Sequence, residues 1–223
     1  MKGVYELIDW LNKEFPNAMI ETCSGGGGRY DLGMMKYSTQ IWTSDNTGPV
    51  ARTLIQYGST FGYSTSTMSC HVANYAGSVE DPRQLDYAFR VALNGPLGYE
   101  FDVLKISDAA KETISRQIKE YRTYENLILC GDFYRLQSPT EKGRYSYYFV
   151  DENNSEILLT YLQNFDDPKR TPNKLKISRA DSGATYRDTI SGETFAGADL
   201  KRGIVVESDK RGNYAKMFHF VKE

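Results

Sequence analysis

The first 137 residues alternate short apolar runs with segments of helical periodicity. Apolar residues recur at helical spacing in residues 4–11, 31–37, 50–57 and 85–93, and in a long segment that Asp108 can cap. Short apolar runs at residues 18–22, 40–43, 67–72 and 97–103 predict strands between these helices. Four strand–helix units in succession predict an α/β fold with a parallel sheet.

The pattern changes near residues 137–139. Short candidate strands follow at residues 145–150, 157–161, 175–178, 184–187, 204–207 and 216–221, and polar turns separate them. This spacing is typical of a small antiparallel β-sandwich. We therefore predict two domains, residues 1–137 and 138–223.

The number of strand–helix units limits the architecture of the first domain. A complete barrel of eight units takes about 250 residues. Four units fit before the β segment, so the first domain is either a small open sheet or part of a larger barrel.

Composition and charge argue against several classes of protein, namely nucleic-acid-binding, membrane and exported proteins. The 27 Lys and Arg residues against 29 Asp and Glu give a net charge of −2, which disfavours nucleic-acid binding. No run approaches the roughly 18 apolar residues of a membrane span, so we expect no membrane partner. Acidic residues within the first helix argue against a signal peptide, and three cysteines without a C-x-x-C pair favour a reducing compartment. A cytoplasmic location is expected.

Four consecutive glycines, Gly25 to Gly28, follow the first predicted strand directly. Glycines in this position let the backbone approach a ligand and offer N–H donors at the next helix start. Arg29 and Tyr30 do not complete a Walker loop, and no G-x-G-x-x-G fingerprint is matched cleanly. A tight turn without a ligand is an equally good interpretation of this segment.

Asp45 is the main candidate for acid–base chemistry. It follows the second predicted strand, and the carboxyl edge of a parallel sheet is where such folds keep active sites. Trp42, three residues earlier, could supply an apolar wall that makes the carboxyl harder to ionise. The alternative is that Asp45 is a turn or cap residue.

Other chemistry-bearing residues carry less weight. Cys70 and His71 are adjacent, so they point to opposite faces of a strand, which argues against a nucleophile–base pair. His219 is the only other histidine, so no metal site is predicted. Glu100 and Asp102 share one side of the fourth strand, where they either line the sheet edge or pair with Arg90 or Arg116.

Taken together, the motifs resemble glycoside hydrolase family 36, the bacterial α-galactosidases. The resemblance rests on CSGGGGRYD at residues 23–31, IWTSDNT at 41–47, Arg52, IQYG at 55–58, HV at 71–72, LGYEFD at 97–102 and GDFYRL at 131–136. These motifs occur in the family's order over about the first 140 residues, and the resemblance is weaker beyond.

The resemblance implies a (β/α)8 barrel, here a partial one of about four C-terminal units, followed by an antiparallel β-sandwich. It implies retaining hydrolysis of α-galactosides such as melibiose and raffinose, without a cofactor. Asp45 would be the acid/base, and Cys23, Ser24, Gly25 and Gly26 would contact the galactose.

The chain also departs from the family pattern. The family nucleophile is the Asp of a Lys-Trp-Asp motif, and these 223 residues contain no such motif. The chain is therefore expected to be the C-terminal part of an α-galactosidase and nearly inactive alone. Gly48 stands where the family often has Asp, and ANYAG at residues 73–77 replaces an Asn-His-Gln continuation.

Three interpretations follow from these observations. The first is an α-galactosidase that takes its nucleophile from elsewhere. The second is a catalytically inactive fragment, or an accessory carbohydrate-binding or assembly module, that joins a complementary N-terminal chain or forms a homo-oligomer. The third, an α/β domain that binds an unrelated small molecule, is disfavoured by the ordered motifs.

Overall fold

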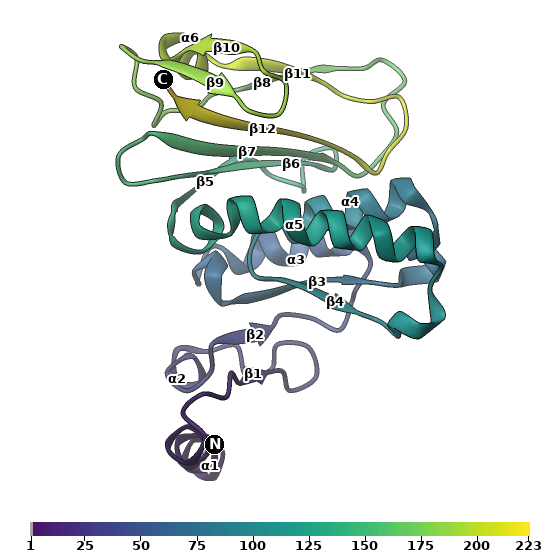
Figure 1. Ribbon diagram of the computed structural model, residues 1–223, viewed down its shortest axis with the longest axis vertical. Coiled ribbons are helices and arrows are strands. Elements are labelled where there is room, and N and C mark those ends of the chain that lie inside the picture. Colours follow the sequence, from purple (N-terminus) through teal and green to yellow (C-terminus); the bar gives the residue numbers. More distant parts are fainter. Residues whose placement is uncertain (1) are drawn as a thin grey trace.

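The structure, a computed structural model, describes residues 2–223 and stacks its elements in layers along the long axis (Figure 1). The N-terminal elements lie at one end, β3 and β4 with their helices lie in the middle, and the antiparallel sheets lie at the other end. The helices are α1 (Lys2–Glu14), α2 (Leu32–Met35), α3 (Pro49–Ser59), α4 (Pro82–Ala92), α5 (Asp108–Cys130) and α6 (Gly197–Arg202). None of these helices is long and apolar enough to cross a lipid bilayer.

Strands β1 (Glu21–Thr22), β2 (Gln40–Trp42), β3 (Met68–Ala73) and β4 (Leu97–Glu100) form a parallel sheet in chain order. Its helix-facing side is apolar, because Met68, Cys70 and Val72 are buried in one core with side chains of α4 and α5. The predicted parallel sheet is thus confirmed. All four strands direct their carboxyl ends to the same edge, and the loops at that edge carry the residues singled out by the sequence.

Two local predictions in this half are wrong. Asp108 does not cap α5: the Ser107 hydroxyl accepts from the Ala110 N–H, and Asp108 lies exposed in the first turn. Strand β4 ends at Glu100, because the Asp102 carboxylate accepts from the Leu104 N–H and closes a 3₁₀ turn. A short polar side chain that bonds to nearby backbone N–H groups ends one element and starts the next.

The second half forms antiparallel sheets. A six-stranded sheet has the order β10-β9-β12-β7-β6-β5, and a two-stranded sheet pairs β11 with β8. Their bounds are β5 (Asp132–Gln137), β6 (Arg144–Val150), β7 (Glu156–Gln163), β8 (Pro172–Leu175), β9 (Thr185–Asp188), β10 (Thr194–Ala196), β11 (Ile204–Glu207) and β12 (Tyr214–Lys222).

Three details of this half differ from the predicted strands. The strand predicted at 175–178 lies earlier, at Pro172–Leu175, because Ile177 instead donates its N–H to the Leu200 carbonyl of α6. The pattern of apolar and polar residues did not predict strand β10. Strand β5 pairs with β6, so the six-stranded sheet already begins at Asp132. The division at residues 137 and 138 stays a prediction.

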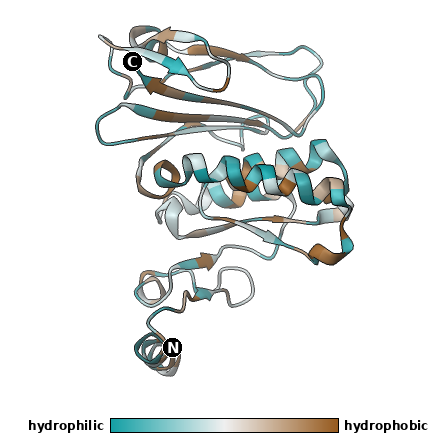
Figure 2. Cartoon of the chain, in the orientation of Figure 1, coloured by the Kyte–Doolittle hydropathy of each residue, from teal (hydrophilic) through white to brown (hydrophobic). Residues whose placement is uncertain are grey.

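The six-stranded sheet is buried on both faces. Tyr147, Phe149 and Leu158 pack with the helices of the parallel sheet, whereas Tyr148 and Leu159 pack under β8, β11 and α6. Consequently β6 and β7 are buried at nearly every position, and neither strand alternates between apolar and polar residues. Figure 2 shows brown stretches along these strands, whereas α5 changes colour along its length as an amphipathic helix does.

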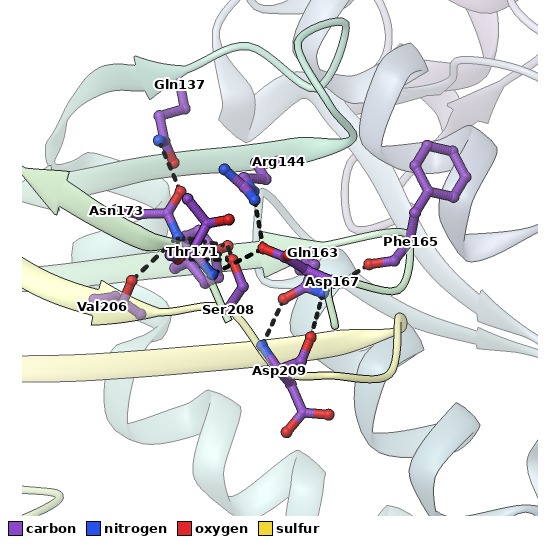
Figure 3. Close-up of polar contacts among 11 residues, drawn as sticks. Gln137, Arg144, Gln163, Phe165, Asp167, Thr171, Asn173, Val206, Ser208 and Asp209 are labelled. Carbon is purple, nitrogen blue, oxygen red and sulfur yellow. Dashed lines mark hydrogen bonds and ion pairs between the residues drawn. The ribbon is translucent and has the colours of Figure 1, made fainter. Parts of the chain in front are cut away.

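A polar network closes the end of this sheet where β7 leads into β8 (Figure 3). The Asn173 amide donates to the Thr171 and Val206 carbonyls, and Gln163 exchanges hydrogen bonds with the backbone of Asp209. Because its members bond mainly to backbone groups, the network fixes the two loops that contain residues 164–171 and 208–213.

One ion pair belongs to this network. The Arg144 guanidinium lies 2.6 Å from the Asp167 carboxylate, and both side chains are largely buried. Hydrogen bonds from Thr171, together with Arg144, hold the pKa of Asp167 at about 2. The ionised carboxylate is therefore favoured in the folded chain.

The depressed pKa of Asp167 predicts how stability depends on pH. Since it lies below the ordinary value of about 3.9, Asp167 contributes stability above about pH 4, and this contribution is lost as the pH falls toward 2. Asp167→Asn is expected to lower the urea midpoint at pH 7 and to differ less from the parent chain at pH 2.5. Glu152→Gln, in an exposed turn, is the control. A difference that does not shrink at low pH would contradict this assignment.

Candidate functional site at the carboxyl edge of the parallel sheet

The loop that follows β1 has an unusual backbone. Ser24, Gly25, Gly26 and Gly27 have φ angles of 78°, 65°, 72° and 95°, so four consecutive residues are left-handed. Glycine adopts this region readily, whereas a side chain makes it costly. The glycine run therefore determines the course of the loop.

This loop lies directly against the backbone that carries Asp45. A β-carbon on Gly26 would lie 2.5 Å from the Asp45 nitrogen, and one on Gly27 would lie 2.6 Å from the Thr43 carbonyl oxygen. The Cys23 sulfur accepts from the Gly26 N–H at 3.3 Å and lies 3.9 Å from an Asp45 carboxylate oxygen. Three of the predicted site residues, Cys23, Gly26 and Asp45, thus lie together.

The other predicted residues lie at the rim of this cluster. Ser24 and Gly25 are exposed, and the Ser24 carbonyl accepts from the Gly28 N–H within the loop. A β-carbon on Gly25 would meet no atom within 4 Å. Asp45 is itself exposed to solvent. The outer part of the loop and the carboxylate are therefore both exposed to solvent.

Arg52 is a buried residue that holds the loop of Asp45 in place. Its side chain is 1% exposed and donates to the Ser44 carbonyl at 3.4 Å and to the Ser69 carbonyl of β3 at 2.7 Å. Burial lowers the pKa of this guanidinium. The sequence assigns Arg52 no role beyond the resemblance, and the available signal is a charged residue among the apolar positions of α3.

Trp42 contacts Arg52 and His71. The Arg52 guanidinium lies 4.5 Å from the centre of the indole ring, and the His71 ring lies 4.8 Å from it. An arginine over an indole is a favourable cation–π contact. These contacts anchor Arg52, and the apolar wall that Trp42 would give Asp45 stays a prediction.

A row of polar side chains crosses the sheet from β1 to β4. Glu21 accepts from Gln40 at 2.7 Å and from the Ser69 hydroxyl at 2.5 Å, and its carboxylate lies 3.5 Å from His71. On the other side, His71 lies 3.7 Å from Glu100. The sequence did not single out Glu21, and only the sheet register, which pairs it with Gln40, reveals this row.

The positions of Glu100 and Asp102 correct part of the sequence analysis. Glu100 faces His71, and Arg90 pairs instead with Glu120 and Asp86. Among residues 2–223, neither Glu100 nor Asp102 therefore forms an ion pair with Arg90 or Arg116. Gly98 makes room for the imidazole, since a β-carbon there would lie 2.3 Å from the His71 ring.

The neighbours Cys70 and His71 do point to opposite sides of β3, as predicted. Cys70 is fully buried in the apolar core, where burial raises the pKa of its thiol to about 12. A thiol that stays protonated is a poor nucleophile. Within residues 2–223, no group of three or more His, Cys, Asp or Glu side chains is arranged to hold a metal ion.

A glycine loop packed against an exposed carboxylate at the carboxyl edge of a parallel sheet defines a candidate active site of an α/β enzyme. The Melibiase family model matches residues 1–131, and the chain belongs to this family.

Similarity to known proteins extends over nearly the whole chain. It is 36% identical over 200 residues to Alpha-galactosidase AgaA of Geobacillus stearothermophilus and 33% identical over 221 residues to Alpha-galactosidase Mel36A of Lactobacillus acidophilus. These matches cover 89% and 98% of this chain, but only 27% and 30% of the relatives. The chain thus spans less than a third of their length.

Solved structures agree with this assignment. The crystal structure of the GH36 alpha-galactosidase AgaB from Geobacillus stearothermophilus superposes with a TM-score of 0.91 at 32% identity, over 99% of this chain and 31% of that one. The galactosidase domain of the alpha-galactosidase–sucrose kinase AgaSK gives a TM-score of 0.90 at 33% identity, with the same two coverages. The resemblance to glycoside hydrolase family 36 is confirmed.

The contact between Gly26 and Asp45 generates a prediction about stability. Both Gly25→Ala and Gly26→Ala place a β-carbon at positive φ, which costs about 1–2 kcal/mol. Only Gly26→Ala also forces the loop away from Asp45. Urea denaturation should therefore show a larger loss of unfolding free energy for Gly26→Ala than for Gly25→Ala. Equal losses would mean that the loop does not pack against Asp45.

Proposed function

We propose that this chain supplies part of the active site of a retaining α-galactosidase, which removes terminal non-reducing α-D-galactose from substrates such as melibiose and raffinose. Asp45 is assigned the acid/base role, and the loop of Cys23, Ser24, Gly25 and Gly26 contacts the galactose. The observation that carries this proposal is the packing of Gly26 against the backbone of Asp45. The Geobacillus AgaA has been crystallised in complex with raffinose, which supports this class of substrate.

In this proposal, the chemistry of Asp45 follows from its position. Its protonated carboxyl gives a proton to the leaving glycosidic oxygen, and its carboxylate then activates the water that cleaves the covalent intermediate. The left-handed glycines expose backbone to the sugar ring without side chains in the way.

A retaining enzyme needs a second carboxylate about 5–5.5 Å from the first. We assign this nucleophile to a segment outside the chain, because the chain contains no Lys-Trp-Asp motif. In the same proposal, β1 to β4 are the last four strands of a (β/α)8 barrel, and the polar row of Glu21, His71 and Glu100 faces its interior. A cytoplasmic location is proposed with this assignment.

A second candidate function is an assembly module without its own chemistry. One observation favours it: large apolar side chains in the first 32 residues are more than half exposed, namely Leu7, Trp10, Phe15, Met19 and Leu32. Within residues 2–223, the outer edges of β1 and β4 also have no strand partner. Such surfaces fit a complementary polypeptide or a second copy of the chain.

The test is hydrolysis of an aryl α-galactoside by two preparations. One is the 223-residue chain alone, and the other is the chain co-expressed with the part of Geobacillus AgaA that precedes the matched region. We expect activity only in the second preparation. Asp45→Asn should lower its rate by at least about 10²-fold, the usual effect of losing an acid/base group.

Asp108→Asn, at an exposed position of α5, is the matched control and should leave the rate unchanged. A complex that forms but does not hydrolyse the substrate would favour the assembly module. Activity of the chain alone that Asp45→Asn abolishes would mean that a carboxylate within the chain is the nucleophile, and the assignment of the strands would then be wrong.

A further inference from the structure

A pocket of about 720 Å³ lies next to the candidate site, and neither the mechanism nor the fold uses it. Its walls come from the N-terminal ends of α3 and α4, the 3₁₀ segment Tyr75–Glu80 after β3, and Asn213 before β12. Asn46, the residue after Asp45, forms part of its rim. This volume is typical of small-molecule sites.

The two departures from the family pattern meet in this pocket. Gly48 and Tyr75 are 27 positions apart, yet a β-carbon on Gly48 would lie 3.5 Å from the Tyr75 ring. Tyr75 is 55% exposed, and Ala76 and Gly77 behind it have positive φ angles. An aromatic ring held on a strained turn and left open to solvent is a surface on which a ligand can stack.

Another part of the lining offers two paired amides, those of Gln84 and Asn213. The Asn213 amide donates to the Gln84 carbonyl oxygen at 2.8 Å, which leaves the Gln84 amino group and the Asn213 carbonyl oxygen without a partner among residues 2–223. Asn46 accepts from the Gly48 N–H through its own carbonyl oxygen, so its amino group is likewise available.

The wall is held rigidly although it joins two distant parts of the chain. Arg83 of α4 donates to the carbonyls of Arg211 and Gly212 at 2.9 and 2.8 Å. The same turn is fixed from the other side by the network of Figure 3. The amides are therefore presented in a fixed arrangement before any ligand arrives.

The lining holds one carboxylate, Asp81, and one of its two oxygens accepts both of its hydrogen bonds. Asp81 accepts from the N–H groups of Arg83 and Gln84 and caps α4. The pocket thus offers an aromatic face and neutral donors and acceptors. This combination suits a neutral polyhydroxylated ring and disfavours an anion.

We propose that this pocket is a saccharide-binding site, in which Tyr75 stacks on a sugar ring and the amides of Gln84 and Asn213 bind its hydroxyl groups. This inference rests on the proposed function, because the saccharide would be the part of the substrate attached to the galactosyl residue. In raffinose that part is sucrose. Gly48, with no side chain, leaves the pocket open beside Tyr75.

Binding can be tested on the 223-residue chain without hydrolysis, by saturation-transfer difference NMR with sucrose as the probe. Tyr75→Ala should weaken the signal at least about fivefold, as expected for the loss of a stacked ring. Phe61→Ala, which removes another exposed aromatic ring outside this pocket, is the matched control and should leave the signal unchanged.

Gly48→Asp is a second variant that should not impair folding. Gly48 is the N-cap of α3 with a φ of −62° and no side-chain cap, a position where Asp is preferred. The variant should therefore melt no lower than the parent chain, while its carboxylate narrows the pocket and reduces the sucrose signal. An unchanged sucrose signal in both Tyr75→Ala and Gly48→Asp, or no signal in the parent chain, would overturn the proposal.

Kinetics of the co-expressed complex show whether the pocket binds the saccharide part of the substrate or a separate saccharide. If the pocket holds the distal part of the substrate, Tyr75→Ala raises KM for raffinose and leaves that for a short aryl α-galactoside unchanged. If sucrose binds but KM for raffinose does not change, the pocket is a saccharide site separate from the substrate path. Sucrose binding without hydrolysis in any preparation would refute the proposed function alone.

Discussion

The candidate site depends on the absence of a β-carbon at Gly26. Only without one can the loop after β1 approach the Asp45 nitrogen, because a β-carbon would lie 2.5 Å from it. This approach brings the Cys23 sulfur to the carboxylate and leaves the outer side of the loop exposed. Arg52 supports the arrangement from below through the Ser44 and Ser69 carbonyls. The site is thus built from backbone contacts that a small number of side chains hold in place.

The second half of the chain contributes to the same edge of the molecule. Its six-stranded sheet is buried on both faces, so its helix-facing side chains form one core with α4 and α5. Gln163 of the polar network holds the turn before β12 through the backbone of Asp209, and Arg83 ties that turn to α4. Asn213 therefore reaches the pocket beside Asp45 from a distant part of the sequence. Both halves therefore contribute residues to the edge that carries the candidate site.

Much of the fold could be predicted from periodicity, and the failures have local causes. The apolar runs around Ile41 and Val72 predicted their strands, and the helical spacing before Tyr121 predicted α5. The boundaries failed where a side chain bonds to backbone, as at Ser107 and Asp102. Strand β10 has three residues and becomes a strand only by pairing with β9, so local pattern could not reveal it.

The sequence by itself determined the family, the alternation of strands and helices in the first half, and the candidate residues Cys23 and Asp45, since the motifs around these two residues are contiguous and local. Only the tertiary structure decided which of them meet. The row from Glu21 through His71 to Glu100 exists because parallel pairing sets the four strands β1 to β4 in register. The pocket exists because Gly48 and Tyr75 follow neighbouring strands whose ends lie at one edge. The register of the sheet brings residues that are far apart in the sequence into contact. A local stretch of sequence does not reveal that register.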